Sequence, residues 1–362
     1  MATNKNQHFV PRCHLRPFTL GSEGAAINLF NLDRKKLIPN APVKNQCARD
    51  YFYGTDARLE EAIQFVESGY AKALNDVAHH SGTLTEANRS AFKIFWLFQN
   101  VRTEAAALRA VQMAETTRNI ADIPAGEFTF GIKEAVQIAC KTFANSMHEI
   151  DDLKFCVLKN KTEVPFITSD NPAVLTNRWR IEKDISSGRS FGIGSAGLLT
   201  LLPLTPQLFF LGYDGDVYSV PNEREIVKIT SARDVIALNR HQFLHCVANV
   251  YVHDAAQEDA LISHYSQIEF ARSKVRHVVH YAQIDRTVGD TTRYEIIPPE
   301  DRDRTKEAIM HSQVIHPQPG IWPSQIRIRT NGSVYTNGTG VGYVRRARTV
   351  VASRREFWRE RA

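Results

Sequence analysis

Hydrophobic residues in the N-terminal half of the chain recur every three or four positions, which is the period of an amphipathic helix. Over residues 59–77 this spacing predicts a helix with Thr55 or Asp56 as its N-cap. A second helix is expected over about 85–119, where the first half is apolar on all sides and is therefore expected to be buried. A third is expected over about 131–149. The N-terminal half is thus predicted to be mostly helical.

After residue 151 the hydrophobic period changes to two, which is the period of a β-strand with one buried face. Residues 26–38 show the same alternation around a turn and predict a small hairpin. Two further helices are expected near 231–247 and 257–275. The strand-like runs cover residues 153–157, 164–168, 199–204, 207–213 and 216–220. Helices first and strands later predict an α+β fold, with a helical N-terminal half packed on a mainly antiparallel sheet from the second half.

These patterns predict a single α+β domain over residues 1–282, helix-rich over 1–150 and strand-rich over 151–282. With 362 residues, 43% of them hydrophobic, the chain is long enough to bury a large core. Residues 283–362 are rich in Pro, Gly and Asn. We expect them to form a peripheral segment that ends in a basic tail.

Cysteine usage and hydropathy narrow the class of protein. The five cysteines are odd in number and scattered, with no Cys-x-x-Cys spacing, which argues against a disulfide framework and against a structural zinc site. The first residues show no apolar run behind a basic region, and no later apolar run reaches the length that crosses a bilayer. The sequence therefore predicts a cytoplasmic protein.

The net charge of +6 resembles that of a nucleic-acid-binding protein until the charges are located. The last 18 residues hold seven arginines and two glutamates, so they supply five of the six net positive charges. A basic tail of this kind is expected to add sequence-independent affinity for RNA or DNA. The arginines expected to contact nucleic acid are Arg345, Arg346, Arg348, Arg354 and Arg355.

One candidate site lies near the N-terminus, where His8, Arg12 and Arg16 are spaced four residues apart. If Pro11 opens a helical turn, the two arginines lie on one side of it and His8 leads into it. Arginines hold phosphate or carboxylate in a bidentate fork, and a histidine can move a proton near neutral pH. The alternative is structural, with these side chains capping an element and pairing with acids such as Asp50.

A second group of polar residues interrupts the buried helix and the strand that follows residue 164. Gln99 and Arg102 lie on one helix face because they are three residues apart. Asp170 lies at the end of an apolar strand, before Asn171 and Pro172, where sites commonly form in a cleft. Its alternative role is an Asx-type turn that fixes the bend.

Three other patterns favour structural roles. The glycine pattern at 192–197 matches a dinucleotide-binding loop, but no convincing strand precedes it. His241 and His245 have the i, i+4 spacing of metal ligands, but no third ligand is apparent, so a semi-buried pair is favoured. The acids at 149–152 lie at a helix C-terminus, where negative charge is unfavourable; this suggests a cation or a basic partner, but a solvated surface is favoured.

The residues of the two candidate sites also carry a resemblance to a family. His8, Pro11, Arg12, Leu15, Arg16 and Phe18 fit a His-x-x-Pro-Arg-x-x-Leu-Arg-x-Phe element, and residues 50–53, 99–103, 169–172 and 202–206 fit later elements. In this order they resemble a widespread bacterial family known as a domain of unknown function, DUF4238, over roughly residues 7–250. The resemblance implies no established activity. It does imply that His8, Arg12, Gln99, Arg102 and Asp170 converge in the fold.

Our leading hypothesis is a hydrolase of phosphodiester bonds in RNA or DNA, as in bacterial defence or toxin-like effectors. Arg12 and Arg102 would hold the phosphate, and His8 would act as general acid or base. Asp170 would orient the histidine or bind a divalent cation such as magnesium or manganese. The remaining substrate-binding candidates are Arg16, Gln99, Ser169 and Asn171.

The competing hypothesis is a non-catalytic module that binds nucleic acid or protein. In it the same polar cluster is a structural network that holds the N-terminal segment on the sheet. The basic tail then recruits nucleic acid or an acidic partner.

Overall fold

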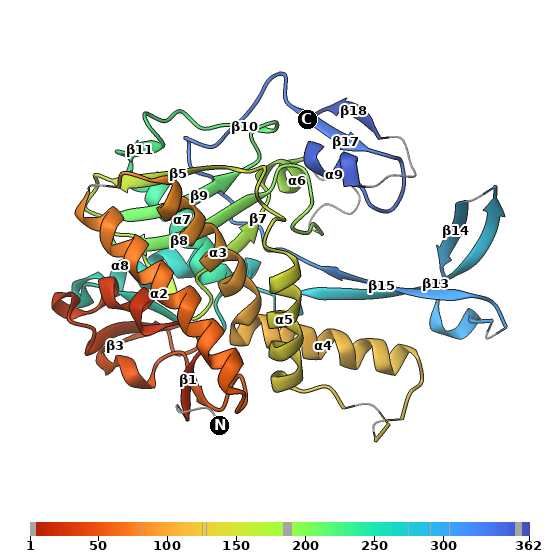
Figure 1. Ribbon diagram of the computed structural model, residues 1–362, viewed down its shortest axis with the longest axis horizontal. Helices are drawn as coiled ribbons and strands as arrows, with labels where there is room; N and C mark the ends of the chain where they lie inside the picture. Colours follow the sequence, from red (N-terminus) through yellow and green to blue (C-terminus); the bar gives the residue numbers. More distant parts are fainter. Residues whose placement is uncertain are drawn as a thin grey trace.

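The computed structural model describes residues 5–80, 82–124, 126–127, 129–183, 190–273, 275–289, 291–303, 305–351 and 357–362. Figure 1 shows the elements, with the helices of the N-terminal half in front of the strands of the second half. The α+β class expected from the hydrophobic pattern is confirmed. In the described part of the chain, no helix combines the length and the apolar character needed to cross a membrane.

The N-terminal segment forms short elements that lie against the first long helix. Strand β1 (Asn6–His8) pairs with β4 (Ala48–Asp50), and α1 (Arg12–Leu15) follows Pro11 as expected. The predicted hairpin is confirmed as β2 (Ala26–Asn31) and β3 (Lys36–Pro42). Short 3₁₀ helices lie at Arg16–Phe18, Leu20–Ser22, Val43–Asn45, Ala255–Gln257, Glu269–Ala271 and Pro299–Asp301.

The long helices of the first half are α2 (Ala57–His79), α3 (Glu86–Arg102), α4 (Glu104–Ile120) and α5 (Ile132–Asn145). The Asp56 side chain caps α2 by accepting from the Arg58 backbone N–H, which confirms one of the two expected caps. The single helix expected over 85–119 is wrong, because Thr103 adopts an extended backbone and divides it. The Thr103 hydroxyl then caps α4 by accepting from Ala106 N–H.

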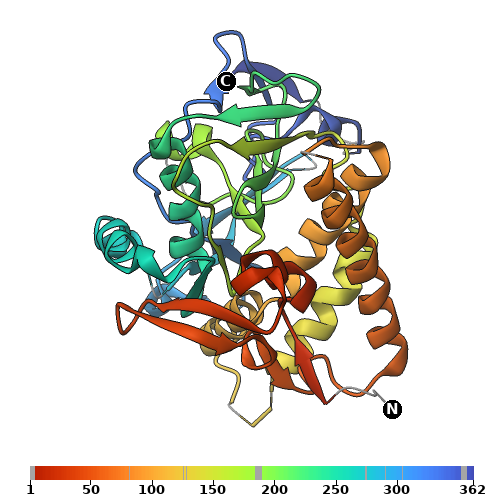
Figure 2. The same ribbon diagram turned by 90° about the vertical axis from the view of Figure 1, so that its left-hand side faces the viewer.

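The main sheet has the strand order β11-β5-β9-β8-β7 and is antiparallel except where β11 joins β5. Its strands are β5 (Lys154–Asn160), β7 (Val174–Thr176), β8 (Leu199–Thr205), β9 (Leu208–Tyr213) and β11 (Ile226–Ile229). Side chains of α2 and α3, including Tyr70 and Trp96, pack on one face with Val157 and Phe210. Figure 2 shows α7 (Ala232–His245) on the opposite side.

A second sheet, β3-β2-β12-β6, places the end of one candidate motif beside a distant strand. Strand β6 (Thr168–Ser169) pairs with β12 (Asn249–Val252), which also pairs with β2 of the N-terminal hairpin. Helix α8 (Glu258–Ser266) follows, and α6 (Arg178–Glu182) lies after β7. Residue 169 is therefore fixed next to the segment that follows α7.

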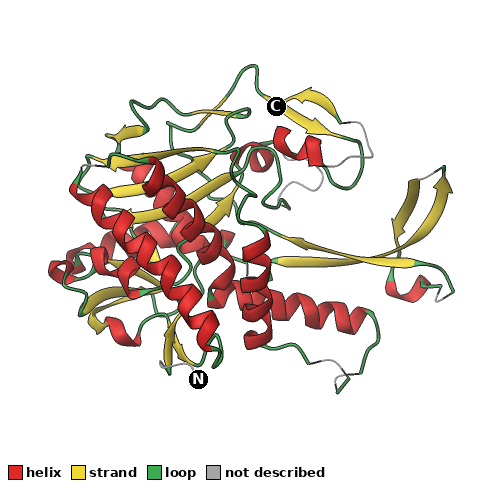
Figure 3. Ribbon diagram, in the orientation of Figure 1, coloured by secondary structure: helices red, strands yellow, loops and turns green. Residues whose placement is uncertain are grey.

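A three-stranded sheet projects from the body of the molecule as an arm, together with α4 (Figures 1 and 3). It consists of β13 (His277–Val288), β14 (Thr291–Ile296) and β15 (Ala308–Val314) in the order β14-β13-β15. At its root the Thr116 hydroxyl of α4 lies 3.0 Å from Nε2 of His277. The two ends of the arm, residues before β13 and after β15, therefore return to the body close to α4.

The sequence predicted a peripheral C-terminal segment, but part of this segment is buried in the core. Trp322, Ile326 and Val334 are buried in the core on the α7 side of the main sheet. The last elements are β10 (Tyr218–Ser219) paired with β16 (Arg327–Ile328), β17 (Ser333–Thr336) paired with β18 (Trp358–Arg361), and α9 (Arg346–Val351). The proline and glycine content of this segment indicated an irregular backbone. It did not show that scattered apolar side chains of the segment are buried in the core.

Candidate functional site

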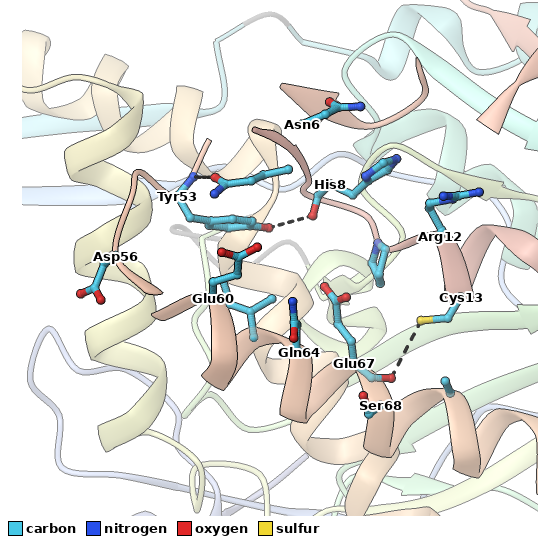
Figure 4. Close-up of a pocket in the computed structure, with 14 residues that line it drawn as sticks. Asn6, His8, Arg12, Cys13, Tyr53, Asp56, Glu60, Gln64, Glu67 and Ser68 are labelled. Atoms are coloured by element: carbon cyan, nitrogen blue, oxygen red, sulfur yellow. Dashed lines mark hydrogen bonds between the residues drawn. The ribbon is translucent and has the colours of Figure 1, made fainter. Parts of the chain in front are cut away.

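His8 and Arg12 line one pocket, which we call the N-terminal pocket (Figure 4). It measures about 390 Å³ and lies between β1, α1 and the first half of α2. Figure 4 shows the side chains of Glu60, Gln64 and Glu67, all from α2, reaching from the helix toward β1 and Tyr53. The pocket thus holds more carboxylates than arginines, which makes it unfavourable for a phosphate.

The His8 side chain is largely buried at the edge of this pocket. Its Nε2 has no partner among the described residues, and burial lowers the pKa of the imidazole more than a hydrogen bond to the Val43 backbone raises it. The Tyr53 hydroxyl donates to the His8 carbonyl at 3.1 Å. His8 is therefore neutral at pH 7 and could accept a proton.

Gln99 and Arg102 do not reach the pocket as substrate-binding groups, because both are fully buried. Gln99 Nε2 donates to the Phe9 carbonyl at 2.7 Å, and Arg102 Nε donates to Gln99 Oε1 at 2.8 Å. Arg102 Nη1 forms an ion pair with Glu67 at 2.7 Å. This network ties the N-terminal segment to α2 and α3. Arg16 lies outside the pocket, and its Nε donates to the Ser22 carbonyl at 3.2 Å.

Asp170 lies elsewhere and does not line the N-terminal pocket. Its carboxylate accepts the backbone N–H groups of Val247, Ala248 and Asn249 at 2.7, 2.8 and 2.9 Å. Burial raises the pKa of Asp170, although these three bonds oppose the shift. Asp170 therefore does not orient His8, as the sequence had predicted. Its carboxylate instead fixes the loop that follows α7.

Ser169 and Asn171 hold the end of the same helix. Ser169 Oγ donates to Gln242 Oε1 at 2.7 Å, and Asn171 Nδ2 donates to the His245 carbonyl at 2.9 Å. Asn171 Oδ1 in turn accepts from the Thr103 hydroxyl at 2.8 Å. The sequence elements around 99–103 and 169–172 therefore do meet, but they meet at the C-terminal end of α7 and not at His8.

Beside that helix end lies a second hollow, which we call the arginine–histidine cavity after Arg109, His245, Arg276 and His316. It measures about 270 Å³, and no Asp or Glu lines it. Arg109 comes from α4 and His245 from α7, while Arg276 precedes β13 and His316 follows β15. The remaining wall is mostly apolar and includes Leu97, Val101, Phe143, Val174, Leu175 and Phe191.

Burial keeps both histidines of this cavity neutral, and a backbone carbonyl fixes the orientation of each ring. His245 is 9% exposed, its Nδ1 donates to the His241 carbonyl at 2.9 Å, and its Nε2 has no partner among the described residues. His316 Nε2 donates to the Phe191 carbonyl at 3.0 Å, and the imidazole of His316 stacks on the Phe191 ring with centroids 3.9 Å apart. Burial lowers the pKa of His316 to about 3 and that of His245 well below its usual value.

The two arginines are placed where positive charge is costly. Burial lowers the pKa of Arg109, and burial followed by the charge of Arg272 lowers the pKa of Arg276 to about 10. Arg276 Nε donates to the Ser273 carbonyl at 3.1 Å. A neighbouring hollow of about 270 Å³ shares Arg109, His245 and Arg276 and adds Arg272, Asp33 and Gln112 to its lining. The two hollows therefore share a wall that contains two arginines, Arg109 and Arg276.

Sequence reasoning missed Arg109, Arg276 and His316, because each is an isolated polar residue without a motif around it. His245 was considered with His241 as a metal-binding pair and as a semi-buried structural pair, of which the second was favoured. In the described part of the chain, no group of three or more His, Cys, Asp or Glu side chains is arranged to hold a metal ion. Asp170, the candidate ligand for magnesium or manganese, directs its carboxylate oxygens at backbone N–H groups.

The arginines near the C-terminus differ in environment. Arg345 was expected to contact nucleic acid, but it is 2% exposed and bonds Asp152 at 2.8 Å and the Glu149 carbonyl at 2.6 Å. Arg348 forms an ion pair with Glu149. The acids at 149–152 thus receive basic partners from the same chain. Arg346 is exposed, while Arg354 and Arg355 lie outside the described residues.

Comparison with known proteins gives a family and no activity. No curated protein and no solved structure matches the chain. The sequence pattern of one family matches residues 6–256, which includes Arg109 and His245 and ends before Arg276 and His316. Because this match covers more than half of the 362 residues, the chain belongs to the family described as Protein of unknown function (DUF4238).

Proposed function

We propose that the protein is a hydrolase of phosphodiester bonds in RNA or DNA and that it acts at the arginine–histidine cavity. One observation carries the proposal: two arginines and two neutral imidazoles meet in a cavity whose lining contains no acid. Arg109 and Arg276 are partly buried, and uncompensated positive charge in such a site is costly, so an anion bound there relieves the repulsion between them. The N-terminal pocket, with Glu60 and Glu67 in its wall, offers a phosphate no such gain.

Arg109 and Arg276 are the groups that would hold the non-bridging phosphate oxygens. Guanidinium groups bind phosphate through paired N–H donors, and a site shielded from water strengthens each bond. Arg276 uses Nε for the Ser273 carbonyl, which leaves its two terminal nitrogens for the ligand. The same contacts would stabilise the additional negative charge of the transition state.

The two histidines supply the proton transfers. His245 Nε2 accepts a proton from a water molecule whose oxygen forms the new bond to phosphorus, while the bond from phosphorus to the leaving sugar oxygen breaks. The leaving oxygen takes a proton from Nδ1 of His316, which takes up that proton from solvent when the phosphate binds beside the ring. The backbone bonds at His245 Nδ1 and His316 Nε2 fix which nitrogen of each ring takes part.

Asp170 and Asn171 are positioning residues in this scheme. Asp170 fixes the backbone of residues 247–249 just after α7, and Asn171 holds the His245 carbonyl. Together they set where the His245 ring lies relative to the arginines. Small displacements of a general base reduce turnover strongly, so these contacts support the proposed reaction without touching the substrate.

The test is turnover by His245→Asn, with the exposed His148→Asn as its control. Wild type is incubated with bis(p-nitrophenyl) phosphate, RNA and DNA, with and without magnesium or manganese. We expect His245→Asn to lose roughly 10²–10⁴-fold in rate and His148→Asn to retain full activity. Wild-type protein that releases no product from any of these substrates would rule out the proposed function.

A non-catalytic module is the second candidate, and the network of Gln99, Arg102 and Glu67 favours it for the N-terminal pocket. These buried side chains bond one another and the Phe9 carbonyl, as a structural network would. Under this alternative the cavity binds an anion without converting it. Binding with no turnover would select it.

A further inference from the structure

The two hollows that meet at Arg109, His245 and Arg276 carry an inference about how the substrate lies. We infer that the scissile phosphate sits at these three shared residues, with one flanking nucleoside in each hollow. The inference rests on the proposed function and specifies its substrate. A phosphodiester has two ester arms, and the structure offers a separate space on each side of the shared cationic wall.

The inner hollow, which is the arginine–histidine cavity itself, suits a single nucleoside at the end of a strand. Its volume of about 270 Å³ lies just below the lower end of the usual range for small-molecule pockets, roughly 300 Å³, so it takes one nucleoside and not two. Phe191 and His316 both line it and stack on one another, so its wall offers aromatic rings for contact with a base. The hydroxyl groups of Thr142 and Ser146 also line this hollow and can meet polar atoms of a base or sugar.

The outer hollow suits the rest of the strand. Its lining adds Arg272, Gln112, Ser273 and one carboxylate, Asp33, to the shared residues and is more polar than the inner wall, with three arginines against that single acid. Arg272 donates to the carbonyls of Phe243 and Cys246 at 2.8 Å each, so its charge is fixed in place beside the shared wall. That fixed charge favours the next phosphate of a strand that continues outward.

This arrangement predicts a preference for strand ends. A strand can place one terminal nucleoside in the inner hollow, whereas a closed circle must push a continuous chain into a space that holds one nucleoside. Linear strands should therefore be shortened from an end, and circular strands of the same sequence should resist. RNA and DNA both carry the required chemistry, so each is tested.

Adding bulk to the lining of the inner hollow tests the placement. Gly192 is an exposed residue of this lining, and a Cβ added there meets no atom within 4 Å, so Gly192→Leu adds bulk at the hollow without a clash at the backbone. Gly69 of α2 is equally open and lines neither hollow, so Gly69→Leu is the matched control. We expect Gly192→Leu to weaken binding of a dinucleoside monophosphate at least tenfold, with Gly69→Leu unchanged.

The experiment combines calorimetric binding of a dinucleoside monophosphate with cleavage of linear and circular single strands of RNA and of DNA. Binding that Gly192→Leu weakens, together with cleavage of linear strands only, supports the inference. Equal cleavage of circles, or binding that Gly192→Leu leaves unchanged, overturns the inference while the hydrolase stands. Binding sensitive to Gly192→Leu with no cleavage of any strand retains the two-hollow placement and removes the proposed reaction.

Discussion

Asn171 donates its side-chain amide to the carbonyl of His245 at 2.9 Å, and this bond joins the Ser-Asp-Asn-Pro element to the arginine–histidine cavity. The same asparagine accepts from Thr103, the residue that separates α3 from α4. Helix α4 carries Arg109 into the cavity. One amide therefore connects the helix end that places the histidine with the helix start that places an arginine.

Replacing Asp170 by Asn is expected to destabilise the fold and to reduce turnover through His245. The amide puts N–H groups where the carboxylate accepts from residues 247–249, so at least one backbone donor loses its acceptor. We expect a loss of about 1–3 kcal/mol in unfolding free energy by urea denaturation. Unchanged stability would mean that the carboxylate does not hold this loop.

Replacing His8 by Asn separates the two pockets. Because His8 lies outside the arginine–histidine cavity, the variant is expected to keep wild-type specific activity while its melting temperature changes modestly. Parallel measurements of melting and of product formation decide the matter. A variant that melts like wild type but has lost its turnover would return the reaction to the N-terminal pocket.

Acid is expected to destabilise the protein through its buried neutral histidines. Burial lowers the pKa of His14, His241 and His316 to about 3, and that of His245 well below its usual value. The unfolded chain binds these protons near pH 6.5, so their contribution is fully present above that pH and is lost as the pH falls below it. Each histidine adds a slope of up to about 1.4 kcal/mol per pH unit, which urea denaturation between pH 7 and 5 measures. A flat profile would contradict neutral burial.

Phosphodiester affinity is expected to rise as the pH falls from 8 to 5. A bound anion beside His316 favours the protonated form of that imidazole, whereas the charge of a phosphodiester itself does not change over this range. Calorimetry in buffers with different ionisation enthalpies should therefore detect proton uptake on binding of a dinucleoside monophosphate. Binding without proton uptake, at an affinity independent of pH, would place the phosphate away from His316.

Replacing Arg345 by Ala is expected to lower stability by about 1–3 kcal/mol, because Asp152 and the Glu149 carbonyl lose a buried donor. The exposed Arg346→Ala is the control and should change stability by less than about 0.5 kcal/mol. Deletion of 345–362 should destabilise further, since it also removes β18. Equal melting of wild type and Arg345→Ala would contradict a structural role and restore the expectation that this residue contacts nucleic acid.

The sequence alone determined the local elements and the α+β class. The hairpin at 26–38 and the cap at Asp56 depend on residues within a few positions of one another, so their pattern is visible without the fold. The break at Thr103 was missed because the apolar run continues through it, and its reason is a bond to Asn171 made only after folding. The motifs are visible in the sequence, but their spacing could not say which partners they meet.

Only the tertiary structure decided which polar residues share a site. Arg109, His245, Arg276 and His316 are far apart along the chain and reach one cavity because α4, α7 and the two ends of the arm pack together. Packing also decided that Arg345 is buried against Asp152. Periodicity reports which face of an element is buried, but the identity of its neighbour depends on contacts between distant segments, and these contacts place the cationic cavity at the end of α7.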